Sequence, residues 1–71
     1  MVTCLLDPGH GGSDPGAVSG ALREKDIVLR VALATASRLS AAGCTVALTR
    51  DQDRVVSLAT RVRKAHELPA D

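Results

Sequence analysis

The chain has 71 residues, a net charge of +1 at pH 7 and no Phe, Tyr or Trp. This length allows one small domain that buries about 60% of the surface of its unfolded chain, so a metal, a disulfide or a partner would have to support a core of Val, Leu, Ile and Ala. Without a basic stripe or aromatic side chains on which bases stack, we expect no binding to nucleic acids.

The first predicted element is a buried strand over residues 2–6, an apolar run that stops at the Pro-Gly pair of residues 8–9. A long loop over residues 7–21 follows and contains five of the six glycines and two of the three prolines. Loops of this length in compact domains are usually functional or disordered. His10 lies among these glycines, directly after the strand, so the loop is the first candidate for a functional site.

A helix is predicted to begin near residues 24–26 and to end at Gly43, because glycine is common just beyond helix C-termini. Apolar side chains recur along this segment at the spacing of one helix face. The face consists of Val28, Val31, Ala32, Thr35, Leu39 and Ala42. Residues 45–49 then form the second predicted strand.

A charged, solvated connection over residues 50–54 precedes the second helix. We expect this helix to begin after Ser57, a favourable N-cap residue, and to continue to about Leu68. Pro69 would end it. Its inward face would be formed by Leu58, Val62 and Ala65.

The order strand, helix, strand, helix predicts a βαβα unit of the α/β class, with parallel strands and a right-handed crossover. Ligands of open α/β sheets bind beyond the carboxyl ends of the strands. His10 follows the first strand and Glu24 heads the helix that returns past it, so the two side chains should converge. Zinc favours imidazole nitrogen and carboxylate oxygen at about 2.0–2.2 Å. We therefore predict half of a metal site at His10 and Glu24.

Each residue of this region also has an ordinary structural interpretation. His10 can be a solvated loop residue, and Glu24 a first-turn carboxylate that interacts with the helix dipole. Asp14 is expected to form a turn and Asp7 to cap the strand end. The glycine cluster at residues 9–12 matches neither of the common phosphate-binding patterns, so a phosphate cradle has weak support.

Two arginines and a second histidine are further candidates. Arg50 and Arg61 could hold an anionic substrate, although surface charge is the default interpretation of both. His66, near the end of the second helix, would complete the three protein ligands of a catalytic zinc site with His10 and Glu24. The same position suits a partly exposed helix residue, and we favour that interpretation.

The two cysteines, Cys4 and Cys44, belong to no CxxC pair and make no disulfide framework. A bridge is geometrically conceivable, because both lie at or beside predicted strands. Free thiols packed as small hydrophobic side chains are the favoured interpretation. The sequence shows no signal peptide and no run of about 20 apolar residues, so we expect no membrane span.

Several motifs together resemble one known family. The segment LDPGHGGSDPGA at residues 6–17 and the segment REKD at residues 23–26 are similar to the opening of the zinc-dependent N-acetylmuramoyl-L-alanine amidases, which cut peptidoglycan. The similarity continues through VALTRD at residues 46–51 and SLATR at residues 57–61, so it extends along essentially the whole chain. This combination is far more specific than any one of its motifs.

The resemblance implies that His10 and Glu24 are zinc ligands. The family's third ligand, a histidine on a later strand, and its general base, a glutamate, would lie beyond Asp71, and His66 does not fall on a ligand position. Residues 1–71 would then be the N-terminal fragment of a larger three-layer α/β amidase domain, without a catalytic residue of their own. The implied substrate is peptidoglycan, and the implied location is the extracellular or periplasmic cell wall.

The implied function is hydrolysis of the amide bond between N-acetylmuramoyl and L-alanine, as in a host autolysin or a phage lysin. The alternatives are a non-catalytic cell-wall-binding module and a pseudo-enzyme remnant. With two ligands and no base, the chain alone should bind zinc weakly and be inactive or nearly so. Half a sheet exposes strand edges and helix faces, which predicts a poorly folded or self-associating polypeptide.

Overall fold

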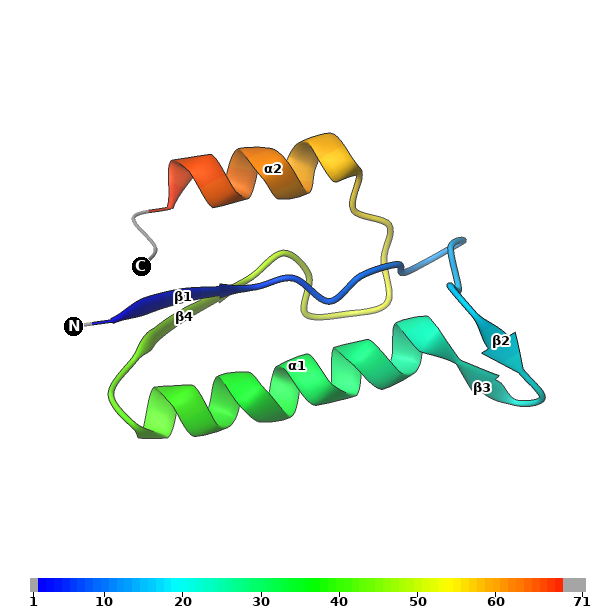
Figure 1. The fold of residues 1–71 in the computed structure, drawn as a ribbon, viewed down its shortest axis with the longest axis horizontal. Coiled ribbons are helices and arrows are strands. Elements are labelled where there is room, and N and C mark those ends of the chain that lie inside the picture. Colours follow the sequence, from blue (N-terminus) through cyan, green and yellow to red (C-terminus); the bar gives the residue numbers. More distant parts are fainter. Residues whose placement is uncertain (1, 69–71) are drawn as a thin grey trace.

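The computed structural model describes residues 2–68. The strands are β1 (Thr3–Leu6), β2 (Val18–Ser19), β3 (Leu22–Arg23) and β4 (Thr45–Leu48), and the helices are α1 (Glu24–Ala41) and α2 (Leu58–Glu67) (Figure 1). This order confirms the predicted βαβα unit and adds one short hairpin, β2–β3, between β1 and α1.

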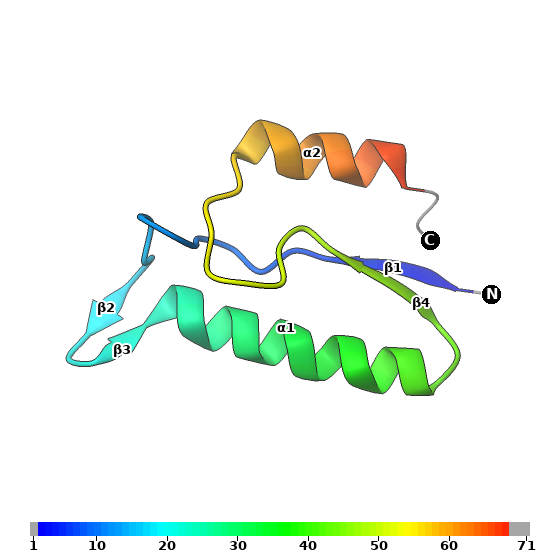
Figure 2. The same ribbon diagram turned by 180° about the vertical axis from the view of Figure 1, so that it is seen from behind.

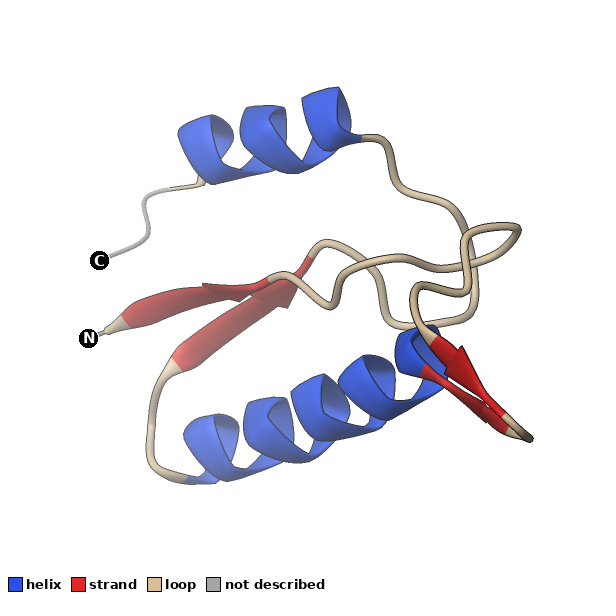
Figure 3. Ribbon diagram, turned by 45° about the vertical axis from the view of Figure 1, so that its right-hand side comes forward, coloured by secondary structure: helices blue, strands red, loops and turns tan. Residues whose placement is uncertain are grey.

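The strands β1 and β4 are parallel neighbours, as predicted, with Thr3 opposite Thr45 and Leu6 opposite Leu48. α1 lies on one side of this pair and α2 on the other, so the elements form three layers (Figures 1 and 2). The carboxyl ends of both strands point towards the same end of the molecule, where the long loops gather (Figure 3). The N-terminal end of α1 lies at that end too, which is what the predicted site requires.

The segment between β1 and α1 contains more regular structure than the predicted loop. β2 and β3 pair antiparallel, with Val18 opposite Arg23 and Ser19 opposite Leu22. Gly20, at φ +59°, lies in the tight turn between them. Two-residue strands are too short to show the alternation by which a strand is recognised in a sequence, so this hairpin was not predicted.

The bounds of α1 agree closely with the prediction. The helix begins at Glu24, after an extended Arg23 (φ −123°, ψ 132°), and Glu24 places negative charge where the helix dipole favours it. It ends at Ala41, and Gly43 turns the chain away in the left-handed region at φ +94°.

The predicted apolar face of α1 is only partly covered. Its half-buried members are Val28, Ala32, Thr35 and Leu39. Val31 is 60% exposed, and Ala42 is exposed and lies beyond the helix end, so these two members of the face are not covered. The helix has 18 residues, whereas each of the two paired strands has four, so the sheet is too small to cover the whole apolar face of the helix.

The N-cap of α2 is confirmed, because the Ser57 hydroxyl accepts a hydrogen bond from the amide of Thr60 (3.1 Å). The predicted inward face of this helix is wrong: Leu58, Val62 and Ala65 are all exposed, and Leu58 is 77% exposed. The prediction that Pro69 ends the helix lies outside the described residues.

Polar side chains, and not apolar ones, hold α2 to the rest of the fold. Lys64 donates to the carbonyl of Thr49 (3.2 Å), and Arg61 donates to the carbonyl of Pro8 in the loop after β1 (2.9 Å). The cationic face of α2 therefore points towards the sheet, and its apolar face points to solvent. This explains why an assignment from hydrophobic spacing alone failed here.

Burial is concentrated in a polar region at the carboxyl ends of the strands. No Val, Leu, Ile, Ala or Cys within residues 2–68 is fully buried, whereas Thr49 and Arg50 are each 1% exposed. The default expectation of surface charge is therefore wrong for Arg50. Cys4 and Cys44 are free and half-buried, as favoured from the sequence. Neither helix in this part of the chain has the length and hydropathy needed to cross a membrane.

Candidate metal centre

The loop after β1 and the first residue of α1 bring the two predicted ligands together. His10 Nε2 lies 3.2 Å from Glu24 Oε2, and both side chains are partly exposed, at 35% and 42%. His10 has a left-handed backbone (φ +61°), and its side chain reaches Glu24 at the start of α1. The convergence predicted from the strand and helix order is therefore present.

Asp14 orients the imidazole from its other side. His10 Nδ1 lies 2.9 Å from Asp14 Oδ2, and because an ionised carboxylate only accepts hydrogen bonds, the ring donates from Nδ1. The second carboxylate oxygen of Asp14 accepts from the amide of Gly16 (3.1 Å). Asp14 forms the predicted turn and also holds the imidazole, a role that its sequence position did not reveal. A carboxylate on the far nitrogen is the usual outer partner of a metal-binding histidine.

Glu24 is held in a comparable way. Its Oε1 accepts a hydrogen bond from the amide of Ala17 (3.0 Å), which leaves Oε2 directed at His10. Gly16 packs against both side chains, since a Cβ built there would lie 2.7 Å from Glu24 Oε1 and 2.8 Å from His10 Cδ2. The two side chains are thus fixed by their own hydrogen bonds and by a glycine that leaves room for them.

The electrostatics of this group follow from these contacts. The pKa of His10 is raised, chiefly by its hydrogen bond to Asp14 and further by the charge of Asp14 and Glu24. The pKa of Asp14 is lowered chiefly by the same hydrogen bond, and the pKa of Glu24 chiefly by the amide of Ala17. Both carboxylates are therefore ionised at neutral pH, while protons compete for Nε2 of the ring.

The geometry fits a metal ion. With Nδ1 carrying the proton, neutral His10 presents a lone pair on Nε2 to a carboxylate oxygen of Glu24, so two acceptors face each other, and either a second proton on the ring or a metal ion between them would relieve their repulsion. Two zinc ligands with bonds of about 2.0–2.1 Å at a tetrahedral angle lie about 3.3 Å apart. The observed separation of 3.2 Å agrees with this value.

A third ligand is not part of the arrangement. Among the described residues, no three His, Cys, Asp or Glu side chains form a group that could hold a metal ion. His66 is exposed on α2 and joins no such group, which agrees with the favoured interpretation of an ordinary helix residue. Residues 2–68 thus provide a pair of candidate ligands.

Ion pairs and hydrogen bonds fasten the surrounding loops to one another. Asp7 pairs with Arg61 and accepts from the Thr49 hydroxyl (2.7 Å), so it links the ends of β1 and β4 to α2. Lys25 pairs with Asp53 (2.8 Å) and also donates to the carbonyl of Gly12 (2.9 Å). Gly12 lies in the loop after β1 that carries His10, residues 7–17, which we call the ligand loop. The Gly12 amide donates to the same Asp53 (2.7 Å).

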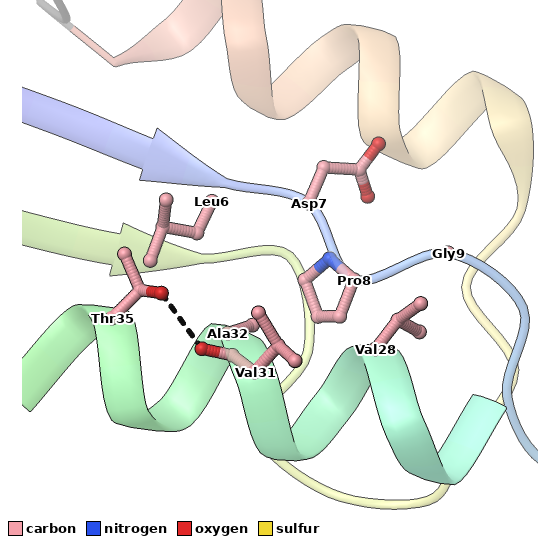
Figure 4. A pocket seen from close by; sticks show the side chains of 8 residues that line it. All are labelled: Leu6, Asp7, Pro8, Gly9, Val28, Val31, Ala32 and Thr35. Carbon is pink, nitrogen blue, oxygen red and sulfur yellow. Dashed lines mark hydrogen bonds between the residues drawn. The ribbon is translucent and has the colours of Figure 1, made fainter. Parts of the chain in front are cut away.

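Two cavities lie in this part of the fold. One of about 320 Å³ is an apolar space between β1 and α1 (Figure 4), lined by Leu6, Asp7, Pro8, Gly9, Val28, Val31, Ala32 and Thr35. The other, of about 300 Å³, lies at the hairpin and is lined by Ala17, Val18, Ser19, Leu22, Glu24 and Ile27. Only the second cavity includes a candidate ligand, Glu24, so it is the one that adjoins the site.

Sequence comparison places the chain in a family. The profile of the family described as N-acetylmuramoyl-L-alanine amidase matches residues 4–71. The chain belongs to this amidase family. It is 48% identical over 68 residues to the N-acetylmuramoyl-L-alanine amidase AmiC of Neisseria meningitidis serogroup B, with 94% of the chain aligned. It is 44% identical over 73 residues to the sporulation-specific N-acetylmuramoyl-L-alanine amidase of Bacillus subtilis, with 100% aligned.

The fold agrees with that of solved amidases. The N-acetylmuramoyl-L-alanine amidase AmiC2 of Nostoc punctiforme superimposes with a TM-score of 0.92 at 41% identity, and covers 97% of the chain. The chain corresponds to 39% of that protein, and spans 16% and 29% of the Neisseria and Bacillus relatives. It therefore matches one segment of each amidase.

Sequence patterns did not reveal the roles of three residues at this candidate site. Asp14 was expected to form a turn only, and Arg50 and Arg61 were expected at the surface, yet the Arg61 side chain is 11% exposed and bonds the carbonyl of His10 (3.0 Å). Most acceptors of the two arginines are carboxylate and main-chain oxygens far away in sequence, whereas Asp14 itself accepts from His10, four positions away. The available signal for the arginines was their place, because Arg50 follows the end of β4 and Arg61 lies in the first turn of α2, where loops of an α/β fold meet.

Proposed function

We propose that the chain is part of a zinc amidase that hydrolyses the amide bond between N-acetylmuramoyl and L-alanine in peptidoglycan, with His10 and Glu24 as two of its zinc ligands. The observation that carries this proposal is the 3.2 Å approach of His10 Nε2 to Glu24 Oε2, with Nδ1 engaged by Asp14. Residues 1–71 would be the N-terminal portion of the catalytic domain, and the cell wall, extracellular or periplasmic, would be its place of action.

The chain's own residues prepare this site in three ways. Asp14 keeps the proton of neutral His10 on Nδ1, so that Nε2 is available as a ligand atom. The amide of Ala17 fixes Glu24 and favours its ionised form. Zinc bound there would polarise the amide carbonyl and lower the pKa of a water molecule to about 7. A third ligand and a general base would come from outside residues 1–71.

Metal content tests the proposal directly. After removal of bound metal with a chelator and incubation with zinc, we expect about one zinc per molecule of a longer protein that contains the chain, measured by mass spectrometry. His10→Ala and Glu24→Ala should each lose this zinc, because each removes one of the paired ligand atoms. His66→Ala is the matched control and should keep it. Retention of zinc by both site variants, or its loss in His66→Ala, would contradict the assignment.

Activity provides the second measurement. The 71-residue polypeptide alone is expected to release little or no stem peptide from purified cell walls, because two ligands without a base leave the catalytic arrangement incomplete. A longer protein that contains the chain, and in which these ligands are intact, should release it. Release by the polypeptide alone at the rate of a complete amidase would contradict the proposed division of the site.

We also propose that the 71-residue polypeptide associates with itself. β1 and β4 are both edge strands of a two-stranded sheet, and Leu58 and Val62 expose an apolar face on α2. Sedimentation should give a mass above that of the monomer that rises with concentration. The double variant Leu58→Lys, Val62→Lys should associate less, because it removes this face. A monomer with one sharp thermal transition would contradict the proposal.

A further inference from the structure

Arg50 is a buried arginine whose hydrogen bonds all go to main-chain carbonyl oxygens. Nε donates to Pro8 (3.1 Å), Nη1 to Gln52 (3.0 Å), and Nη2 to both Gly9 (2.7 Å) and Lys25 (3.0 Å). The residue follows β4 and is 1% exposed. A charged group at such depth requires good hydrogen-bonding partners, and four carbonyl oxygens provide them.

The two acceptors of Nη2 belong to the two segments that carry the candidate ligands. Gly9 directly precedes His10, and Lys25 directly follows Glu24. One nitrogen atom therefore joins the main chain beside one ligand to the main chain beside the other. His10 and Glu24 are separated by 13 residues of loop and hairpin, and the two hydrogen bonds of Nη2 connect their segments directly.

We propose that Arg50 is the positioning residue that sets the distance between His10 and Glu24 and so the affinity and geometry of the metal site. The inference rests on the proposed function, because it assumes that these two residues are ligands. Arg50 itself touches neither side chain through the hydrogen bonds described. It acts through the carbonyl groups next to them.

The chemistry of the guanidinium group suits this task. Its five N–H donors lie in one rigid plane, so bonds to one segment fix where bonds to the other can form. A lysine at this position would keep the charge but would offer a flexible tetrahedral ammonium. Room for the group comes from Gly11, where a Cβ would lie 2.9 Å from Arg50 Nε.

Arg61 provides an internal comparison. It donates to the carbonyls of Pro8 (2.9 Å) and His10 (3.0 Å) and to Val56 (3.2 Å), and it pairs with Asp7. These acceptors lie in the ligand loop and in the connection before α2. Arg61 therefore fastens the ligand loop, whereas Arg50 fastens that loop to α1.

The test is Arg50→Lys in the zinc-binding protein, with two measurements. Zinc affinity, measured by competition with a chromophoric chelator, should fall about 10–100-fold, the range seen when an outer partner of a metal ligand is lost. The visible absorption spectrum of the Co²⁺-loaded protein should change in intensity and position, because it reports the coordination geometry. The charge is conserved, so a loss of affinity would not come from a change in net charge.

Two control variants separate positioning from a general loss of stability. Arg63→Lys alters an arginine on α2 whose side chain is 66% exposed, and should leave both measurements unchanged. Leu39→Ala removes a half-buried side chain from the far end of α1, and should lower the melting temperature without changing the Co²⁺ spectrum. If Arg50→Lys lowers only the melting temperature, as Leu39→Ala does, the inference is overturned.

Arg50→Gln is the second variant, since it retains a planar donor group without charge, and it should weaken zinc binding at least as much as Arg50→Lys. If neither variant folds even with zinc, Arg50 is required for the fold and the inference is overturned. If the unsubstituted protein binds no zinc, the proposed function fails first. If it binds zinc and Arg50→Lys binds equally well with the same spectrum, only the role of Arg50 is rejected.

Discussion

Substitution of Gly16 by alanine should reduce zinc affinity on the order of 100-fold or more, at the upper end of what the loss of an outer-shell contact produces. The added Cβ would lie 2.7 Å from Glu24 Oε1, 2.8 Å from His10 Cδ2 and 2.9 Å from Glu24 Cβ. Contacts below 3.0 Å force a shift, and the atoms that must shift belong to the two proposed ligands. Zinc competition against a chelator measures the effect.

Gly20→Ala is the matched control for this substitution. Gly20 has a similar positive φ (+59° against +69°), but a Cβ there meets nothing within 4 Å. Both variants pay about 1–2 kcal/mol for a left-handed alanine, and only Gly16→Ala adds steric contact with the site. Equal zinc affinity in the two variants would show that Gly16 matters only for the backbone, and would contradict the close packing described here.

Substitution of Gly11 by alanine should destabilise the fold by on the order of 3 kcal/mol or more, through strain and overpacking together. The Cβ would lie 2.2 Å from the carbonyl oxygen of Arg54 and 2.9 Å from Nε of the buried Arg50, at a φ of +125° that alanine rarely adopts. A main-chain oxygen and a guanidinium group with four partners cannot easily move. The midpoint of denaturant unfolding of the zinc-loaded protein measures the loss.

Gly43→Ala separates strain from steric contact in the same way. Gly43 also has a positive φ (+94°), but its Cβ would enter open space at the end of α1. It should therefore lose only the backbone contribution of about 1–2 kcal/mol. If Gly11→Ala loses no more unfolding free energy than Gly43→Ala, the loop relaxes around the extra carbon. The segments bonded to Arg50 would then be more mobile than their hydrogen bonds indicate.

Local sequence rules correctly predicted the helix ends, which depend on residues only a few positions away. Ser57 caps α2, Gly43 turns the chain after α1, and the acidic first turn of α1 begins at Glu24, because capping, left-handed glycine and the helix dipole act within a few residues. The parallel pairing of β1 and β4 also followed, since a helical crossover between two strands leaves few alternatives. The same rule brought His10 and Glu24 together.

Hydrophobic spacing was a poor guide to burial in this chain. Leu58 and Val62 have the spacing of an inward helix face but are exposed, because α2 is attached through Lys64 and Arg61 on its other side. Spacing shows which residues share a face of a helix. It does not show which face of the helix will lie against the sheet when the helix is attached by a few polar contacts.

The sequence by itself determined the βαβα order, the family and the identity of the two proposed ligands, because these depend on short-range patterns and on motifs that can be read along the chain. The tertiary structure alone decided the burial of Arg50 and the engagement of His10 Nδ1 by Asp14. The acceptors of Arg50 in the ligand loop and α1 lie 25 to 42 positions away, and no local pattern encodes such a distance. Only the folded chain brings these carbonyl oxygens around one guanidinium group.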